Sequence, residues 1–298
     1  MVTVLCPVFN HLGYIRQCLE SLVMQETDFV YEVIVRDDAS TDGTDRIIRE
    51  FAEKYPSVVR AVIERENMNG HFGERVVSMI RGEYVAFCEG DDFWTDPRKL
   101  QKQYDYMVAN PDCALCVHNV TEMRADRPVG LFFNLSEGDY TGEDACRTWM
   151  FHASSFFARA GCYLSCLETM RKSKVHLTFG DTLIVLACAN SGRIHALPDV
   201  MSVYRRHNAG WTARKSARKY YETARSWEEV PAMFGERYKV PSRFNLVYNY
   251  LMGMVYALKE GRVRLFFLCV AKGVMRYPAM TWEIMMKVLK TKASRHDA

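Results

Sequence analysis

Three carboxylates stand within four residues at the end of an apolar run. The run Tyr84–Cys88 is followed by Glu89, Asp91 and Asp92, with Gly90 between the first two. An aromatic and β-branched run bounded by turn residues is typical of a buried strand, and open α/β sheets bind ligands at the carboxyl ends of strands. Packed carboxylates repel one another unless a cation neutralises them, and oxygen ligands favour Mg²⁺ or Mn²⁺. The stretch predicts a divalent-metal site for a phosphate-bearing substrate, with a solvated acidic turn as the alternative.

A second acidic turn follows the apolar run Tyr31–Val35. A carboxylate of this turn, Asp37–Thr44, could accept hydrogen bonds from a base or a ribose, whereas Ser40 and Asp42 are residues that form turns and cap helices. The turn after the first apolar run, Pro7–His11, contains no glycine, and no Walker A sequence is present. The phosphates of a bound nucleotide would therefore need the carboxylates and a metal as their neutraliser.

Two later segments carry further reactive residue types. Asp181 opens an apolar helical segment, where it is either a helix cap or a general base. The segment Tyr204–Trp211 is basic and aromatic, and its Arg205, Arg206 and His207 are of types that bind phosphates and metals. Arg205 or Arg206 could contact a phosphate group at close range.

Strands and helices that position these residues are predicted from hydrophobic spacing. Strands are expected at residues 2–6, 31–35, 58–63, 84–88, 113–117 and 156–158. Helices are expected at residues 12–24, 74–81, 97–109 and 182–190, and one further helix follows the second acidic turn and ends at residue 51. Repeated β-α-β units imply a mainly parallel sheet. A hairpin is expected from Ile194–Leu197 and Val200–Tyr204, turning at Pro198 and Asp199. His118 and His152 are expected to be structural or to contact an acceptor.

The composition is that of a folded globular protein. The 298 residues are 49% hydrophobic and 25% charged, enough for one large domain or for one domain with an appendage. The N-terminus lacks the basic and long apolar regions of a signal peptide, and ten scattered cysteines are typical of reduced thiols in the cytoplasm. The uncharged stretch Phe244–Leu258 has 15 residues and is too short to span a membrane.

The C-terminal part differs from the rest in charge. From Ala213 to Ala298 there are 17 Lys and Arg against 7 Asp and Glu. Short helices expected at residues 243–258, 262–275 and 279–290 mix aromatic and aliphatic residues with Lys and Arg, a combination that suits an anionic membrane surface. We therefore predict a basic helical appendage, residues 213–298, after a catalytic domain, residues 1–212. The alternative is that the apolar faces pack on the catalytic domain or in a dimer, and no nucleic-acid-binding motif is present.

In order and spacing, these segments resemble the family 2 glycosyltransferases of the GT-A type, inverting enzymes that use nucleotide-activated sugars, here of the bacterial surface-polysaccharide kind. The segments are Pro7–Asn10, Asp37–Thr44, Glu89–Trp94, Gly180-Asp181 and Tyr204–His207. The resemblance runs from Val2 to about Trp211. It implies a GT-A fold, a Rossmann-like, mainly parallel α/β sheet flanked by helices.

The resemblance also implies a role for each matched residue. Pro7, Phe9 and Asn10 would border the base, and Asp38 would read it, usually as uracil. Glu89 and Asp91 match the outer positions of the D-x-D motif, which contact ribose and metal, although Glu89 replaces the commoner Asp. The remaining matches are Asp92 and His207 as metal or diphosphate contacts, Asp181 as the catalytic base, and Arg75 near a position that is often basic.

The activity implied is transfer of a hexosyl or N-acetylhexosaminyl group, with inversion, from a nucleotide sugar to an acceptor hydroxyl. A UDP-sugar is the favoured donor, Mn²⁺ or Mg²⁺ the cofactor, and a surface glycan or lipid-linked oligosaccharide the acceptor, on the inner face of the cytoplasmic membrane. Two alternatives stand beside it. One is a non-catalytic nucleotide-sugar-binding or scaffold protein of the same fold. The other is a sugar nucleotidyltransferase, which would need a glycine-rich, basic first loop that this sequence lacks.

Overall fold

A computed structural model describes residues 1–68, 74–208, 210, 213 and 215–293. Trp211, the predicted end of the family resemblance, lies outside these residues. The chain divides into two compact units. The first comprises Met1–Thr141, Trp149–Leu167 and Ile184–His207, and the second Gly142–Thr148, Glu168–Leu183 and Asn208–Ala298. Helices α6 (Ala160–Arg171) and α7 (Gly180–Ser191) have residues in both units. The simple boundary after residue 212 stays a prediction.

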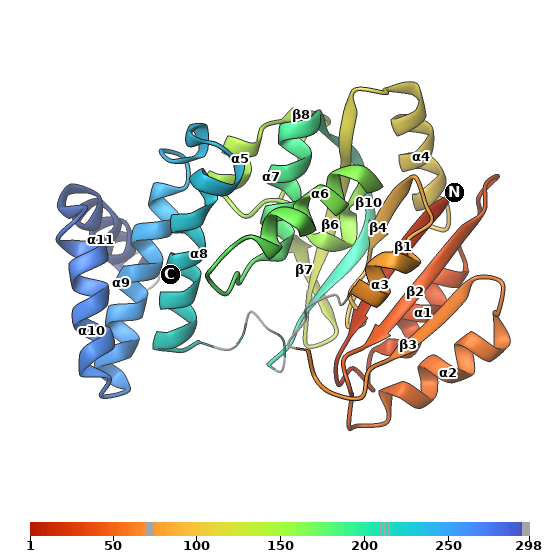
Figure 1. The fold of residues 1–298 in the computed structure, drawn as a ribbon, viewed down its shortest axis with the longest axis horizontal. Helices are drawn as coiled ribbons and strands as arrows, with labels where there is room; N and C mark the ends of the chain where they lie inside the picture. The colour runs from red at the N-terminus through yellow and green to blue at the C-terminus, as the bar shows by residue number, and fades with distance from the viewer. Residues whose placement is uncertain (69–73, 209, 211–212, 214, 294–298) are drawn as a thin grey trace. The chain divides into compact units, whose positions relative to one another are not determined.

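Within the described residues of the first unit, ten strands form one sheet (Figure 1). They are β1 Val2–Val8, β2 Tyr31–Asp37, β3 Val59–Ile63, β4 Tyr84–Phe87, β5 Phe93–Trp94, β6 Cys113–Arg124, β7 Arg127–Leu131, β8 Gly138–Tyr140, β9 Phe157–Arg159 and β10 Arg193–Arg206. The order is β3-β2-β1-β4-β9-β6-β10-β5, with β7 beside β6 and β8 beside β10. Strands β1 to β4 pair in parallel, as do β6 and β10, whereas β9 runs antiparallel to β4 and β6. The predicted α/β class, a sheet flanked by helices, is confirmed.

The sheet is buried on both faces because its central strands are continuously apolar. Alternate β1 residues, from Val2 to Val8, share one core with buried side chains of three helices. These helices are α1 (Ile15–Val23), α2 (Thr44–Lys54) and α4 (Lys99–Ala109). Leu5 of β1 and Ile34 of β2 are also fully buried, although they point to the opposite face. Fixed in this way, the carboxyl ends of β1, β2 and β4 lie side by side.

The predicted hairpin at Pro198 and Asp199 is wrong. Residues 193–206 form one strand, β10, and both halves of it pair in parallel with β6. The register shifts between Leu197 and Val200, so Pro198 and Asp199 bulge from the ladder and do not reverse the chain. Asp199 there accepts a hydrogen bond from Lys102 of α4, at 2.6 Å. As a result β10 continues toward the carboxylate turn.

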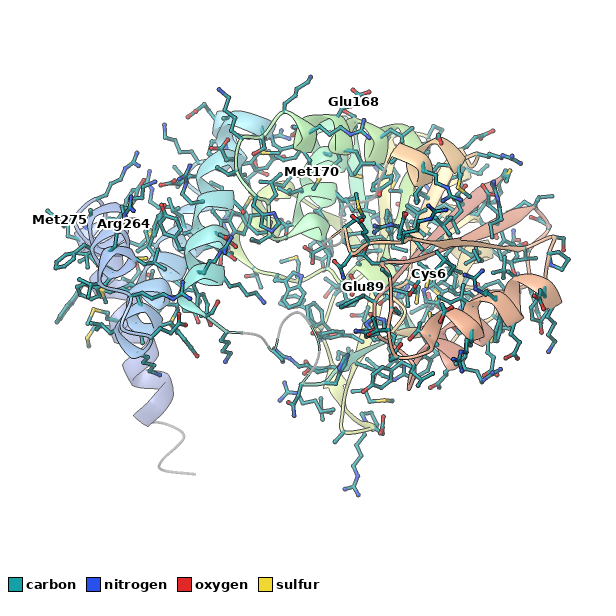
Figure 2. The ribbon with its side chains drawn as sticks, turned by 60° about the horizontal axis from the view of Figure 1, so that its bottom comes forward. Cys6, Glu89, Glu168, Met170, Arg264 and Met275 are labelled. Atoms are coloured by element: carbon teal, nitrogen blue, oxygen red, sulfur yellow. The ribbon has the colours of Figure 1, made fainter. Side chains whose placement is uncertain are left out.

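The second unit is helical. Its longer helices are α8 (Ala217–Phe234), α9 (Arg243–Lys259), α10 (Val263–Cys269), which continues as a π-helical turn at Val270–Val274, and α11 (Pro278–Ala293). Val247 and Leu251 of α9 pack with Ile284 of α11 in a small core. The predicted C-terminal helices are therefore confirmed. Arg264 and Met275 lie at the surface of this unit (Figure 2).

None of the described helices combines the length and the apolar character needed to cross a bilayer.

Candidate active site

The carboxylate turn, residues 89–92, follows β4 and is held against the end of β1. The Gly90 N–H donates to the carbonyl of Pro7 at 3.0 Å, and the Asp92 N–H donates to the carbonyl of Glu89 at 2.9 Å. The approach is so close that a Cβ atom at Gly90 would lie 2.9 Å from His11 Nδ1 and from Val8 Cγ2. Glycine is therefore the residue that fits here. The turn brings a carboxylate oxygen from each of Glu89, Asp91 and Asp92 within 4.8 Å of one another.

The two aspartates have opposite electrostatic environments. His207 Nε2 lies 3.0 Å from Asp91 Oδ2, and His11 Nε2 lies 3.7 Å from the same oxygen. Burial opposes ionisation of Asp91, but the hydrogen bond from His207 and a smaller contribution from His11 lower its pKa overall. Burial, with the charges of Asp91 and Glu89, instead raises the pKa of Asp92 far above its usual value.

Arg205 ties the end of β10 to the turn. Its backbone N–H donates to Asp92 Oδ1 at 2.9 Å, and its guanidinium donates to the Asp91 carbonyl at 2.6 Å and to Gln17 of α1. The guanidinium carbon also lies 5.3 Å from the ring centroid of Tyr14 and 4.4 Å from that of Phe93. These contacts make Arg205 a positioning residue for the turn. Its predicted direct contact with a nucleotide stays a prediction.

The donor set of the turn fits a divalent cation. Among the described residues, Asp91 Oδ1 and Asp92 Oδ2 are buried and have no hydrogen-bond partner. Buried carboxylate oxygens without a partner destabilise a fold, and Mg²⁺ and Mn²⁺ prefer oxygen ligands. Asp91 and Asp92 could therefore hold such an ion, as predicted, with Glu89 close enough to take part. His207, the third predicted ligand, adjoins Asp91.

The turn after β1 is locked to the turn after β2. The Asn10 N–H donates to Ser40 Oγ and the Thr41 N–H donates to Asn10 Oδ1, both at 2.8 Å. Asn10 has a φ of 54°, in the left-handed region where Asn is better tolerated than most residues. The predicted base-bordering residues Pro7, Phe9 and Asn10 therefore form a fixed rim beside the carboxylate turn. Phe9 is 37% exposed and could contact a bound base.

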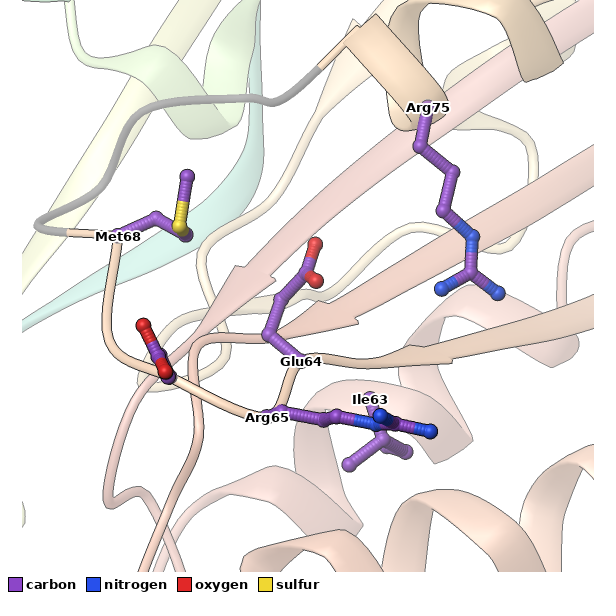
Figure 3. Close-up of a pocket in the computed structure, with 6 residues that line it drawn as sticks. Ile63, Glu64, Arg65, Met68 and Arg75 are labelled. Carbon is purple, nitrogen blue, oxygen red and sulfur yellow. The ribbon is translucent and has the colours of Figure 1, made fainter.

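Asp38 lies in an ion-paired group at the end of β2. Its Oδ1 accepts hydrogen bonds from Arg36 at 2.7 Å and from the Met68 N–H at 2.8 Å. The Arg36 guanidinium also contacts Glu64 at 3.2 Å. Beside this group is a pocket of about 460 Å³ (Figure 3). Its lining residues are Ile63, Glu64, Arg65, Glu66, Met68 and Arg75. Of these, Glu64 contacts Arg36 and Met68 donates its N–H to Asp38. The reading of a base by Asp38 stays a prediction.

Asp181 belongs to the second unit. It is the second residue of α7, and its Oδ1 accepts the N–H of the next residue, Thr182, at 2.7 Å. It therefore lies inside the first helical turn and not at the N-cap position that the sequence suggested. The preceding segment is anchored on α8, because Phe179 stacks on Trp227 at 4.4 Å and the Thr178 N–H donates to Ser226 Oγ at 3.2 Å. The role of Asp181 as catalytic base stays a prediction.

His152 is a site neighbour whose contact with the carboxylates was not expected from the sequence. Its Nδ1 accepts the N–H of Ser154 at 3.3 Å and lies 3.8 Å from Asp92 Oδ2. Burial lowers the pKa of His152 to about 4, so the ring is neutral at pH 7. His118 is also buried, and burial lowers its pKa, but its Nδ1 contacts only the Asn119 carbonyl among the bonds of the described residues. The expectation of a structural His118 agrees with this position.

Comparison with known proteins identifies the family. The sequence model of glycosyl transferase family 2 matches residues 3–158, more than half of the chain. The chain belongs to this family. An uncharacterized protein of Mycobacterium tuberculosis is 37% identical over 221 residues, 72% of this chain and 62% of its own length. TuaG of Bacillus subtilis, a glycosyltransferase named for teichuronic acid biosynthesis, is 31% identical over 149 residues, 49% of this chain and 57% of its own length.

Solved structures share the GT-A fold with this family 2 protein. S. aureus TarS (residues 1–349), in complex with UDP-GlcNAc, has a TM-score of 0.60 at 16% identity, covering 96% of this chain and 92% of that one. The Pyrobaculum calidifontis mannosyltransferase PcManGT, in complex with GDP-Man and Mn²⁺, has a TM-score of 0.58 at 20% identity, covering 99% and 86%. The predicted family and fold are thus confirmed.

Three residues that sequence reasoning did not single out lie against the candidate site. They are His11 beside Asp91, and Tyr14 and Gln17 beside Arg205. Of these, only His11 could have been found from the sequence, because it ends the turn that follows the first predicted strand. Tyr14 and Gln17 read as ordinary residues of an amphipathic helix, and only the fold brings them to Arg205.

Proposed function

We propose that this family 2 glycosyltransferase moves a hexosyl or N-acetylhexosaminyl group, with inversion, from a nucleoside diphosphate sugar to an acceptor hydroxyl. The observation that carries the proposal is the carboxylate turn. Its Asp91 and Asp92 each have a buried oxygen without a hydrogen-bond partner in the described chain, at the carboxyl end of β4. The S. aureus protein of the same fold binds UDP-GlcNAc, which supports a UDP-sugar as donor.

Asp91 and Asp92, with Glu89 and His207 adjoining, would hold Mn²⁺ or Mg²⁺. When bound, such an ion neutralises charge on a diphosphate leaving group. The Mn²⁺ in the PcManGT complex supports this assignment. Arg205 keeps the turn in position through its bonds to Asp91 and Asp92. His207 keeps Asp91 ionised through its hydrogen bond.

The nucleoside would bind on the β1–β2 side of the carboxylate turn. Phe9 offers a partly exposed ring, and Asn10 and Ser40 fix the rim. Asp38 bonds to Met68 of the adjoining pocket, which Arg75 also lines. In the transfer, the acceptor oxygen bonds to the anomeric carbon while the bond from that carbon to the diphosphate oxygen breaks. Asp181 takes the proton of the acceptor hydroxyl, so one displacement inverts the anomeric centre.

The experiment measures release of nucleoside diphosphate from a panel of UDP- and GDP-sugars, with Mn²⁺ and with excess EDTA. The Asp91→Asn variant should lower turnover by on the order of 10²-fold or more, since it removes one preorganised charge. Asp105→Asn is the matched control, because Asp105 lies on the exposed surface of α4 and its bond from Gln101 survives the change. Full activity in EDTA contradicts the metal assignment. Tight binding of a nucleotide sugar without turnover points to a non-catalytic binding protein.

We also propose that the acceptor is a surface or lipid-linked glycan and that α10 and α11 contact an anionic membrane. TuaG, a relative, is named for the synthesis of teichuronic acid, which supports the acceptor class. Phe267, Met275 and Trp282 are 63%, 73% and 64% exposed, in a unit that also exposes Arg262 and Arg264. Exposed aromatic and apolar side chains beside basic ones suit a lipid interface.

Co-sedimentation with liposomes tests the membrane contact. Binding should rise with the fraction of anionic lipid, weaken with salt, and fall in a Phe267→Ser/Trp282→Ser variant. Val240→Ser is the control, since Val240 is 68% exposed but belongs to neither helix. Wild-type protein that ignores anionic liposomes at low salt refutes the membrane contact and leaves the transfer activity untouched.

A further inference from the structure

An aromatic cluster of the first unit has no role in the function proposed above. It consists of Phe132, Trp149, His152 and Tyr204. The ring of His152 lies 4.3 Å from that of Tyr204, and the ring of Phe132 lies 4.8 Å from that of Trp149 and 5.4 Å from that of His152. The segments that supply these rings follow β7, precede β9 and belong to β10.

Only one ring of the aromatic cluster is strongly exposed. His152 and Tyr204 are 4% and 7% exposed, whereas Trp149 is 41% exposed. Beside Phe132, the β7 residue Leu131 is also 40% exposed. A large indole that is held by neighbouring rings and still meets solvent is an apolar surface of a kind that often marks a binding site. Trp149 can therefore bind an apolar face with little loss of conformational freedom.

The aromatic cluster is tied to the carboxylate turn by two contacts. His152 Nδ1 lies 3.8 Å from Asp92 Oδ2, and the residue after Tyr204 donates its backbone N–H to Asp92 Oδ1 at 2.9 Å. His152 is itself fixed, because its Nδ1 lies 2.9 Å from Ser154 Oγ, which lies 2.9 Å from Ser202 Oγ of β10. The ring of Trp149 lies 6.3 Å, between centroids, from the ring of His152, and His152 in turn adjoins Asp92.

The order of the sheet separates the aromatic cluster from the nucleoside side. The rim residues Phe9 and Asn10 and the acidic Asp38 follow β1 and β2, and the carboxylate turn follows β4, the next strand in the order. Beyond β4 come β9, β6 and β10, whose neighbourhood supplies the aromatic cluster. A donor with its base on the β1–β2 side and its diphosphate at the carboxylates therefore leaves the aromatic cluster to a different part of the reaction.

We propose that Trp149 is a stacking surface for a pyranose ring of the acceptor glycan, and so a specificity-determining residue for the acceptor; this rests on the proposed function. One face of a pyranose ring presents C–H groups, and these pack on the negative face of an indole while the hydroxyls stay in water. Stacking of this kind tolerates many sugars, because it needs only one apolar ring face. Trp149 would hold the acceptor ring without taking part in the chemistry.

Saturation-transfer NMR on the full chain tests this, with UDP and Mn²⁺ present. The probes are methyl glycosides of glucose, galactose, mannose and N-acetylglucosamine, and their β-linked disaccharides. Ring C–H protons of the probes should receive saturation from the wild type. Trp149→Ala should weaken the binding by on the order of tenfold, and Trp149→Phe should keep part of it. Trp282→Ala, which alters an exposed tryptophan of the second unit, should bind as the wild type does.

Binding of UDP is titrated separately for each variant, so the two proposals fail independently. A wild type that does not bind UDP with Mn²⁺ contradicts the UDP-sugar donor of the proposed function. If the wild type binds UDP and no pyranoside of the panel, the proposal for Trp149 is wrong, because stacking is tolerant of sugar identity. It is also wrong if Trp149→Ala binds pyranosides as the wild type does, or if it loses UDP instead, which would make Trp149 a contact of the nucleoside. Unfolding by urea, measured on Trp149→Ala and Trp149→Phe, separates loss of binding from loss of fold.

Discussion

Replacing Gly90 by alanine should damage the carboxylate turn by steric pressure alone. The added Cβ would lie 2.9 Å from Val8 Cγ2 and from His11 Nδ1, whereas ordinary contacts begin at 3.4 Å. Val8 is 3% exposed. The His11 backbone N–H is bonded to Thr44 Oγ1 at 3.0 Å and its ring Nε2 lies 3.7 Å from Asp91 Oδ2, so neither side chain moves freely. The turn must therefore shift by about 0.5 Å. We expect a loss of about 1–3 kcal/mol in the free energy of unfolding, the usual cost of overpacking.

The shift should also reduce turnover. A displacement of about 1 Å in a catalytic group costs about 10²-fold, so a shift of half that size predicts a loss between about tenfold and 10²-fold. Urea unfolding measures the stability, and release of nucleoside diphosphate measures the rate. Gly13→Ala is the control, since a Cβ there meets nothing within 4 Å. If Gly90→Ala matches Gly13→Ala in both measurements, the close packing of the turn does not control the site.

Three further predictions concern charged groups. Asp181→Asn keeps an oxygen that can accept the Thr182 N–H but removes the basicity of the side chain. It should therefore spare UDP binding and lower transfer by ~10²–10⁴-fold, and lost UDP affinity with normal turnover would contradict the base assignment. Mn²⁺ should raise the thermal midpoint of the wild type more than that of Asp91→Asn, and equal shifts would remove Asp91 from the metal site. Burial lowers the pKa of Lys99 to about 7, so above that pH the unfolded chain binds more protons at Lys99 than the folded chain does. In urea unfolding, the stability of the wild type relative to Lys99→Met should therefore rise from pH 7 toward pH 10 by about 1 kcal/mol per pH unit. A stability difference that does not change with pH would refute the burial of the Lys99 amine.

Most of the strands and both acidic turns could be predicted from the sequence, because short-range patterns specify them. The run Tyr84–Cys88 is apolar and ends at carboxylates, and a four-residue strand does end there, at Phe87. The parallel direction of β1, β2 and β4 followed from alternating elements and from the rule for crossovers, whereas their order in the sheet did not. The divalent-metal hypothesis followed from charge repulsion among Glu89, Asp91 and Asp92, which the structure brings within 4.8 Å of one another.

What could not be predicted depends on contacts between distant parts of the chain. His11 and His207 meet at Asp91, yet 80 and 116 residues separate them from it in sequence. The residue type of Arg205 predicts a phosphate contact, which stays a prediction, but it gives no indication of the guanidinium bonds to Gln17 and to the Asp91 carbonyl. Pro198 and Asp199 are residues typical of turns, but the long ladder between β10 and β6 continues on both sides of them and accommodates them in a bulge.

The carboxylate turn lowers the stability of the fold in a way that a purely structural turn would avoid. Burial and the neighbouring charges raise the pKa of Asp92, so its ionised form is disfavoured in the folded chain. An amide at this position could equally accept the Arg205 N–H that Asp92 Oδ1 accepts, and would carry no charge. Buried charges and partnerless oxygens that persist despite their cost are typical of functional sites. A solvated acidic turn has neither property, since water would satisfy its oxygens. The energetics of Asp91 and Asp92 thus favour a binding site over the solvated turn that the sequence alone left open.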